Sequence, residues 1–207
     1  MKKKNLHYLV GIDEAGRGPL AGPIAIGAVL AEISDPKFLN SKKNLNPEFK
    51  ILKNIKDSKK MSASQRERWE KIIRANFKCH CVFVSHKQID KIGINKAAIL
   101  GIQKVLEKFS KRADLVLLDG SLRAPEKYRQ KTIIRGDEKI PLISAASIIA
   151  KTGRDKKMLF YHKKFPQYGF DRHKGYGTKL HYDRLLKYGP SEIHRKTYLK
   201  NLKNKEG

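Results

Sequence analysis

Residues 11–23 read GIDEAGRGPLAGP. The apolar run 6–12, LHYLVGI, leads directly into two adjacent acids, Asp13 and Glu14, and a second apolar run covers 24–31. Two apolar runs joined by a turn rich in glycine and proline predict a β-hairpin. The sequence therefore predicts a pair of carboxylates at the end of a strand, where a glycine turn begins.

The composition indicates a compact protein with a polyanionic partner. The chain has 207 residues, of which 40% are hydrophobic, so one domain with a sizeable core is expected. Lys and Arg number 46 against 20 Asp and Glu, a formal net charge of +26. Such an excess favours nucleic acid as the partner, although a generally lysine-rich proteome would also produce it.

The cysteines and the N-terminus predict a soluble, cytoplasmic protein. Cys79 and Cys81 lie two residues apart on an expected strand, where a disulfide would be strained, so both are predicted to be buried and reduced. The first residues resemble a signal peptide, but the apolar stretch is short and ends at Asp13. No run approaches the length of a transmembrane helix, and no membrane association is expected.

The remaining chain alternates predicted helices with predicted strands. Helices are expected over 62–77, 89–109 and 141–162, with Ser62 as an N-cap, and further strands over 78–85, 113–120 and 131–139. This alternation predicts an α/β domain with a mixed sheet and a helical C-terminal segment. We place the catalytic domain at 1–165 and a helical substrate-binding segment at 166–207.

Acidic residues end three of the predicted strands. They are Asp13 with Glu14, Asp119 and Asp137. A single acid of this kind is more often a solvated strand end, but several that converge would bind a hard divalent cation such as Mg²⁺. Adjacent strand residues point to opposite faces, so Asp13 and Glu14 can share a site only if the chain leaves strand geometry at the glycines that follow.

Six sequence blocks together resemble ribonuclease HII, the bacterial type 2 ribonuclease H. They are GIDEAGRGPLAGP, DSKKMS at 57–62, LLDG at 117–120, RGDEKIPLISAASIIAKTGRD at 135–155, HKGYGTKLH at 173–181 and GPSEIHR at 189–195. The resemblance implies a ribonuclease H-like fold, with a five-stranded mixed sheet flanked by helices and a small helical C-terminal segment. The sequence differs from the usual pattern in four places. The connection before DSKK is longer and lysine-rich, Arg135 replaces a lysine, GDEKIPL differs from the common GDAKS, and Gly153 replaces a helix former.

The resemblance also implies the reaction. By this resemblance the protein would be a metal-dependent endonuclease that hydrolyses the RNA strand of RNA–DNA hybrids. It would also nick duplex DNA on the 5′ side of a single embedded ribonucleotide, by two-metal-ion catalysis, and leave 3′-hydroxyl and 5′-phosphate ends. The partners are then RNA–DNA hybrids and duplex DNA that contains ribonucleotides, the cofactor is Mg²⁺ or Mn²⁺, and we expect a monomer.

The family's functional residues match ten positions of this sequence. The four catalytic and metal-binding acids fall on Asp13, Glu14, Asp119 and Asp137. The nucleic-acid-binding residues fall on Gly16, Arg17 and Gly18, whose backbone senses the 2′-hydroxyl, on Tyr176, which reads the RNA-to-DNA junction, and on Lys59 and Lys60, which hold phosphates.

Other interpretations stay open at this stage. A non-catalytic nucleic-acid-binding protein would explain the charge, and a type 3 ribonuclease H is a nearer alternative, against which the GRG motif and the short N-terminus speak. Tyr176 could be only a loop anchor. His173, His181 and His194 have no metal-site spacing, so surface or phosphate-facing roles are expected for them.

Overall fold

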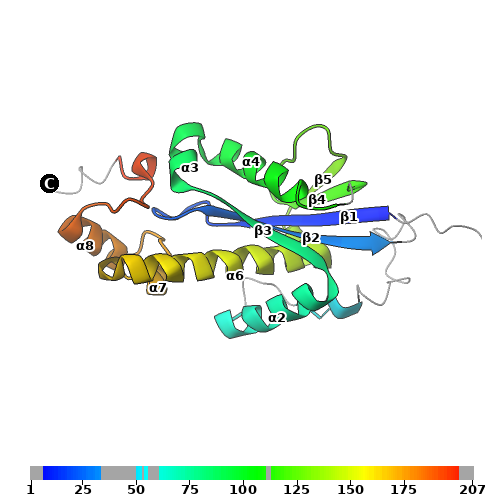
Figure 1. The fold of residues 1–207 in the computed structure, drawn as a ribbon, viewed down its shortest axis with the longest axis horizontal. Helices are drawn as coiled ribbons and strands as arrows, with labels where there is room; N and C mark the ends of the chain where they lie inside the picture. The colour runs from blue at the N-terminus through cyan, green and yellow to red at the C-terminus, as the bar shows by residue number, and fades with distance from the viewer. Residues whose placement is uncertain (1–6, 34–49, 53, 56–60, 111–112, 201–207) are drawn as a thin grey trace, which may run out of the picture.

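In the computed structural model, the chain forms a twisted sheet with helices on both faces (Figure 1). The structure describes residues 7–33, 50–52, 54–55, 61–110 and 113–200. The strands are β1 (His7–Ala15), β2 (Ile24–Ile33), β3 (Lys78–Val84), β4 (Leu115–Asp119) and β5 (Gln130–Ile133). The helices are α2 (Ala63–Asn76), α3 (His86–Ile92), α4 (Ile94–Leu106), α5 (Gly136–Lys139), α6 (Pro141–Lys164), α7 (Phe170–His173) and α8 (Lys179–Tyr188), with 3-10 turns η2 (Pro166–Tyr168) and η3 (Lys196–Tyr198).

The sheet is five-stranded and mixed, in the order β3-β2-β1-β4-β5. The hairpin predicted at the glycine turn is confirmed, because β1 pairs antiparallel with β2. On its other side β1 pairs parallel with β4, and β4 pairs parallel with β5. The predicted fold class is confirmed, and β1 is the central strand.

Two hydrophobic layers cover the sheet. One lies between the sheet and the pair α3–α4, and it contains Ile12, Ile26 and Ile102. The other lies between the opposite face and the helices α2 and α6, and it contains Leu142, Ala146 and Ile73. Because both faces are covered, β1 and β2 are almost entirely buried, as their continuous apolar sequences require.

The helices follow the predicted pattern, with one exception. Ser62 caps α2 and accepts a hydrogen bond from the Gln65 amide, as predicted. The single helix expected over 89–109 is wrong, because Gly93 takes a φ of 79° and divides it into α3 and α4. Glycine adopts this backbone conformation without the steric cost that a side chain would bring.

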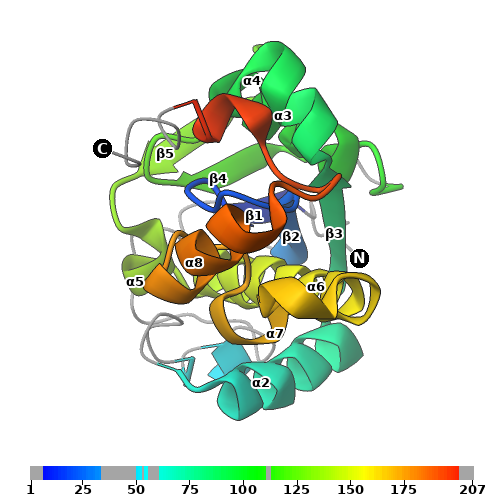
Figure 2. The same ribbon diagram turned by 90° about the vertical axis from the view of Figure 1, so that its left-hand side faces the viewer.

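The C-terminal segment packs against the end of the sheet where β1 finishes. Figure 2 shows α7 and α8 in front of the strand ends, next to α6. Their shared core contains Leu20, Met158, Phe170 and Leu185, so it includes the glycine turn and α6. The division of the chain at residue 165 stays a prediction. None of the described helices is long and apolar enough to cross a membrane.

Helix α6 lies unusually close to the hairpin because glycines face it. A Cβ atom added at Gly27 would come within 2.6 Å of the Ala150 backbone nitrogen, and one at Gly11 within 2.5 Å of the Leu142 carbonyl oxygen. Gly153, which departs from the family pattern, has the same role against β3. There an added Cβ would meet Cys81 Sγ at 2.7 Å. Small residues thus set the distance between α6 and the sheet.

Substitution of Gly27 tests this packing. Gly27→Ala is expected to lower the free energy of unfolding by about 1–3 kcal/mol, because the methyl group meets helix backbone that cannot rotate away. Gly18→Ala is the control, since a Cβ there has no heavy atom within 4 Å. Denaturant unfolding of both variants measures the difference, and equal stability of the two would contradict the packing argument.

Candidate active site

Two of the predicted acids come from the paired strands β1 and β4. The parallel register joins Ile12 to Leu118, so Asp13 and Asp119 are the next residue of each strand. Residues that are in register on parallel strands point to the same face, so the two carboxylates lie side by side. Asp13 is buried and Asp119 is half-buried.

The third acid reaches the same place from a helix. Asp137 was predicted at the end of a strand, and this is wrong: β5 ends at Ile133, and Asp137 lies in the first turn of α5. Arg135, with a left-handed φ of 54°, turns the chain back toward β4. The backbone amides of Gly136 and Asp137 then donate hydrogen bonds to Asp119 Oδ1 at 2.6 and 3.2 Å.

Asp13, Asp119 and Asp137 form a compact carboxylate cluster. One carboxylate oxygen of each lies within 4.8 Å of the others. Three carboxylates this close repel one another, and a hard divalent cation with oxygen ligands neutralises them. The donor set therefore fits Mg²⁺ or Mn²⁺ and suits neither a thiolate- nor an imidazole-preferring metal.

Helix α6 contributes polar groups to this cluster. The pKa of Asp13 is raised to about 6, mainly by burial and also by the nearby charge of Asp119, against the opposing effects of a hydrogen bond from Ser147 and the charge of Lys151. Ser144 Oγ donates to the carbonyl oxygen of Asp137. Ser144 and Ser147 thus hold the site in place.

Glu14 stands beside the cluster rather than within it. The chain leaves strand geometry only after both acids, because β1 pairs with β2 through Ala15 and Gly16 then takes a φ of 95°. Burial raises the pKa of Glu14 to about 8, with Asp13 as the next cause, and Arg17 opposes the shift. The Arg17 Nε atom lies 3.9 Å from Glu14 Oε1. Glu14 therefore lies at the rim of the cluster, where the charges of Asp13 and Asp119 raise its pKa.

The glycine turn is held from behind by a buried arginine. Arg195 donates through Nη2 to the Gly16 carbonyl at 2.6 Å, through Nη1 to Arg17 at 2.8 Å and through Nε to Gly22 at 3.0 Å. Its side chain is fully buried. The carbonyls of Gly16, Arg17 and Gly22 face Arg195, and Gly18, in the same turn, is exposed to solvent.

A second buried arginine, Arg154 of α6, supports the same turn. Its Nε donates to the Pro23 carbonyl at 3.0 Å and its Nη2 to the Ala21 carbonyl at 3.2 Å. Gly16 has a φ of 95°, and a Cβ there would lie 2.5 Å from Arg154 Cδ, so only glycine fits. Burial lowers the pKa of Arg154 to about 10, which leaves it charged at neutral pH.

Sequence reasoning missed Arg154 and Arg195 as site residues. Both fall inside the blocks TGRD and EIHR that carry the family resemblance. One signal could have found Arg154: it follows a helix segment composed almost entirely of small and apolar residues, where a charge is costly unless it is hydrogen-bonded. No comparable pattern surrounds Arg195.

The other predicted nucleic-acid-binding residues divide into two groups. Tyr176 is on the loop between α7 and α8, 48% exposed, and the Arg154 guanidinium carbon lies 5.6 Å from its ring centroid. One part of the ring is thus occupied by a cation while the rest is open to solvent. Lys59 and Lys60 lie outside the residues that the structure describes.

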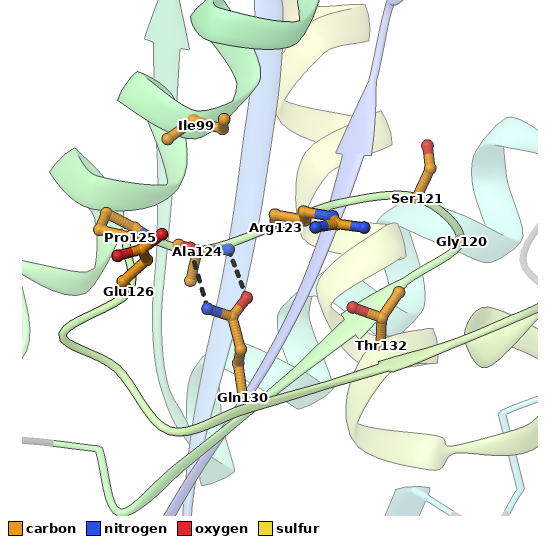
Figure 3. A pocket seen from close by; sticks show the side chains of 9 residues that line it. All are labelled: Ile99, Gly120, Ser121, Arg123, Ala124, Pro125, Glu126, Gln130 and Thr132. Atoms are coloured by element: carbon orange, nitrogen blue, oxygen red, sulfur yellow. Dashed lines mark hydrogen bonds between the residues drawn. The ribbon is translucent and has the colours of Figure 1, made fainter.

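A groove begins at Gly120, the residue after Asp119, and follows the loop between β4 and β5. Figure 3 shows this cavity of about 580 Å³, which Gly120, Ser121, Arg123 and Thr132 help to line. An adjoining cavity of about 240 Å³ shares Ser121 and Arg123 and extends to Arg17. The loop is held by Gln130, whose amide exchanges two hydrogen bonds with the Ala124 backbone at 2.8 and 2.9 Å.

The burial of Asp13 predicts how the stability of the protein depends on pH. Because the pKa of Asp13 rises from 3.8 to about 6 on folding, its charge destabilises the metal-free protein above pH 6 and has no such effect below pH 3.8. Asp13→Asn is therefore expected to raise the free energy of unfolding by about 1–3 kcal/mol at neutral pH and to bring no gain in acid.

Divalent cations provide the second half of this experiment. Mn²⁺ or Mg²⁺ should raise the melting temperature of the wild-type protein, since a ligand that binds only the folded state stabilises it. The rise should be lost in Asp13→Asn and kept in Asp183→Asn, which changes an exposed acid on α8. Equal stabilisation of both variants would exclude the cluster as the metal site.

Comparison with known proteins agrees with this geometry. The sequence model of the family described as Ribonuclease HII matches residues 10–201. Ribonuclease HII of Caldicellulosiruptor bescii is 40% identical over 196 residues, which cover 94% of this chain and 88% of the relative. Ribonuclease HII of Coxiella burnetii is 41% identical over 192 residues, which cover 92% and 87%.

Solved structures share this fold. The ribonuclease H2 of Pyrococcus horikoshii shares the fold, with a TM-score of 0.71, 24% identity and coverage of 95% of this chain and 97% of that one. Archaeoglobus fulgidus RNase HII, solved in complex with PCNA, has a TM-score of 0.72, 26% identity and coverage of 94% and 96%. This chain belongs to the ribonuclease HII family and is a metal-dependent ribonuclease.

Proposed function

We propose that this enzyme hydrolyses the RNA strand of RNA–DNA hybrids and nicks duplex DNA on the 5′ side of single embedded ribonucleotides. The products carry 3′-hydroxyl and 5′-phosphate ends. The observation that carries the proposal is the buried cluster of Asp13, Asp119 and Asp137, beside a glycine turn whose far side is open to solvent. A phosphodiester at the cluster would bring its sugar against that turn.

The acids supply the catalytic part of this proposal. Asp13, Asp119 and Asp137 would hold the divalent cations, and Glu14 would join them from the rim. Such cations, held in a pair, would neutralise the phosphate charge and make a water molecule easier to deprotonate. The protein's own task is to fix the carboxylates, which Ser144, Ser147 and the amides of α5 do through hydrogen bonds.

The glycine turn supplies the discrimination between RNA and DNA. Only the 2′-hydroxyl differs between the two sugars, and it is both a donor and an acceptor. Gly16, Arg17 and Gly18 form a turn that Arg154 and Arg195 fix from behind, and Gly18 is its exposed residue. A rigid backbone distinguishes a single hydroxyl better than a mobile side chain, because it loses no entropy on binding.

The surface charge and the groove support a duplex rather than a mononucleotide substrate. The chain carries 46 Lys and Arg residues against 20 Asp and Glu, an excess far larger than the charge of the three-carboxylate cluster. The groove beside Asp119 continues past Ser121 to Arg123, so a strand cut at the cluster has a lined path in that direction. Tyr176, with its open ring, would stack on the deoxyribose that follows the ribonucleotide.

A non-catalytic nucleic-acid-binding protein is the second candidate, favoured by the charge alone. It explains neither the buried carboxylate cluster nor its support by α5 and α6. Buried like charges cost free energy, and a polyanion would be repelled by them. In such a binding protein, neutralising Asp13 would leave affinity equal or higher, with no activity to lose.

The direct test is a duplex that contains one ribonucleotide. Wild-type protein with Mg²⁺ or Mn²⁺ is expected to nick it on the 5′ side of the ribonucleotide, and to cut the RNA strand of a hybrid. Asp13→Asn should lower the rate by more than roughly 100-fold, the effect of altering groups that only support metal ligands. Asp183→Asn should be unaffected. Product mapping on a sequencing gel gives the cut position, and full activity of Asp13→Asn would refute the proposal.

The role of Tyr176 is tested separately. We define junction preference as the cleavage rate at a single ribonucleotide in DNA divided by the rate in a uniform RNA–DNA hybrid. Tyr176→Ala should lower it by roughly tenfold, the scale of one lost stacking contact, and leave metal binding intact. Tyr176→Phe keeps the ring and should keep the preference. An unchanged ratio in Tyr176→Ala would mean that the residue only anchors its loop.

A further inference from the structure

Three histidines form a buried group behind Tyr176. His173, His181 and His194 were expected at the surface or facing phosphates, and this is wrong: they are 8%, 0% and 2% exposed. The rings of His173 and His181 stack with centroids 4.3 Å apart, and those of His181 and His194 lie 5.1 Å apart. Phe170 packs edge-on against His181 at 5.6 Å. The group belongs to the core of the C-terminal segment.

The hydrogen bonds of His194 and His181 fix which nitrogen of each ring carries the proton. The Ser191 amide donates to His194 Nδ1 at 2.9 Å, so that nitrogen is an acceptor and Nε2 carries the hydrogen. His194 Nε2 then donates to His181 Nε2 at 3.0 Å. The remaining nitrogen, His181 Nδ1, carries a hydrogen and donates to the Tyr176 carbonyl at 2.9 Å. The result is a one-directional chain from Ser191 to Tyr176, here called the imidazole relay.

The hydrogen bonds of the imidazole relay can all form only when His181 and His194 are both neutral, because each ring must offer one acceptor nitrogen. A proton added to His181 Nε2 would face the N–H of His194 across 3.0 Å, and one added to His194 Nδ1 would face the Ser191 amide. The pKa of both rings is lowered to about 4, mainly by burial; His173 contributes for His181, and His181 and His173 contribute for His194. His86 also opposes a charge on His194. Among the described residues, no carboxylate lies within ion-pair distance of either ring.

The relay ends on the backbone of the residue that is proposed to read the junction. The Tyr176 carbonyl also accepts from the Thr178 amide at 2.8 Å, and the Gly175 carbonyl accepts from the Leu20 amide at 2.8 Å. His173 Nδ1 accepts from the Gly175 amide at 3.1 Å. The loop is therefore tied to the histidine group on one side and to the glycine turn on the other. The backbone that carries the exposed Tyr176 ring is therefore held in one position.

We propose that His181, held in one tautomer by His194, is a positioning residue that sets the Tyr176 ring for junction recognition. It touches neither the substrate nor the metal. This inference rests on the proposed function of Tyr176. His181 acts through one hydrogen bond to the Tyr176 carbonyl, and His194 acts by making the other nitrogen of His181 an acceptor.

Two substitutions of His181 separate this hydrogen bond from simple packing. His181→Asn keeps an N–H group near the position of Nδ1, within reach of the Tyr176 carbonyl, but leaves a void. His181→Leu fills the space better and donates nothing. We expect His181→Leu to lower junction preference roughly 3- to 10-fold, the value of one neutral hydrogen bond, and His181→Asn to retain most of it. The hybrid cleavage rate, which does not depend on a junction, should change little in either.

The order of the two variants decides the question. A merely structural histidine predicts the opposite order, with His181→Leu closer to wild type because it fills the core better. That order, or equal junction preference in both, would overturn the inference. If His181→Leu does not fold, as judged by its melting curve, His181→Gln replaces it, since its amide reaches toward His194 rather than Tyr176 and should show the same loss.

Tyr176→Ala, measured in parallel, distinguishes failure of the inference from failure of the proposed function. If Tyr176→Ala loses junction preference and His181→Leu keeps it, the relay inference alone is wrong. If Tyr176→Ala keeps the preference, both the tyrosine's proposed role and the relay inference fall, whereas ribonuclease activity that depends on Asp13 stands independently.

Discussion

Parallel hydrogen bonding between β1 and β4 brings Asp13 alongside Asp119, although the two residues belong to different halves of the sequence. A shift of this register by one residue would turn one carboxylate to the opposite face of the sheet, since side chains alternate along a strand. The packing of α6 on β1 and β2 through Gly11 and Gly27 keeps the strands in place. The catalytic geometry therefore depends on backbone pairing and close packing in the core.

The active site has a cost in stability that the rest of the fold offsets. Burial and mutual repulsion raise the pKa values of Asp13 and Glu14, which means that their charged forms are disfavoured in the metal-free protein. Ser147, Lys151 and Arg17 reduce this cost without removing it. A site fully balanced by fixed protein charges would have little affinity left for a cation. Incomplete compensation is thus what suits the cluster to a divalent cation.

The C-terminal segment acts as part of the site rather than as a cover for it. Arg195 comes from this segment and donates to the glycine turn at the end of the first strand, while Arg154 of α6 holds the same turn from the other side. Both guanidiniums are buried and are satisfied by backbone carbonyls instead of acids. A buried carbonyl needs a donor, so the turn is stable only when the segment is docked. In this way the region proposed to read the substrate and the region proposed to cut it are joined in one hydrogen-bonded unit.

The local sequence determined the hairpin, the cap at Ser62, the apolar strands and the identity of the acids, because alternation, capping and turn chemistry act over a few residues. The motifs gave the family for the same reason. Tertiary structure alone decided that Asp137 arrives on a short helix, that Glu14 stands at the rim, and that Gly93 divides a helix. It also decided that Arg154, Arg195 and the three histidines lie buried behind the loops. These features arise from contacts between distant segments, and no local pattern records which carbonyl a buried arginine or imidazole will meet.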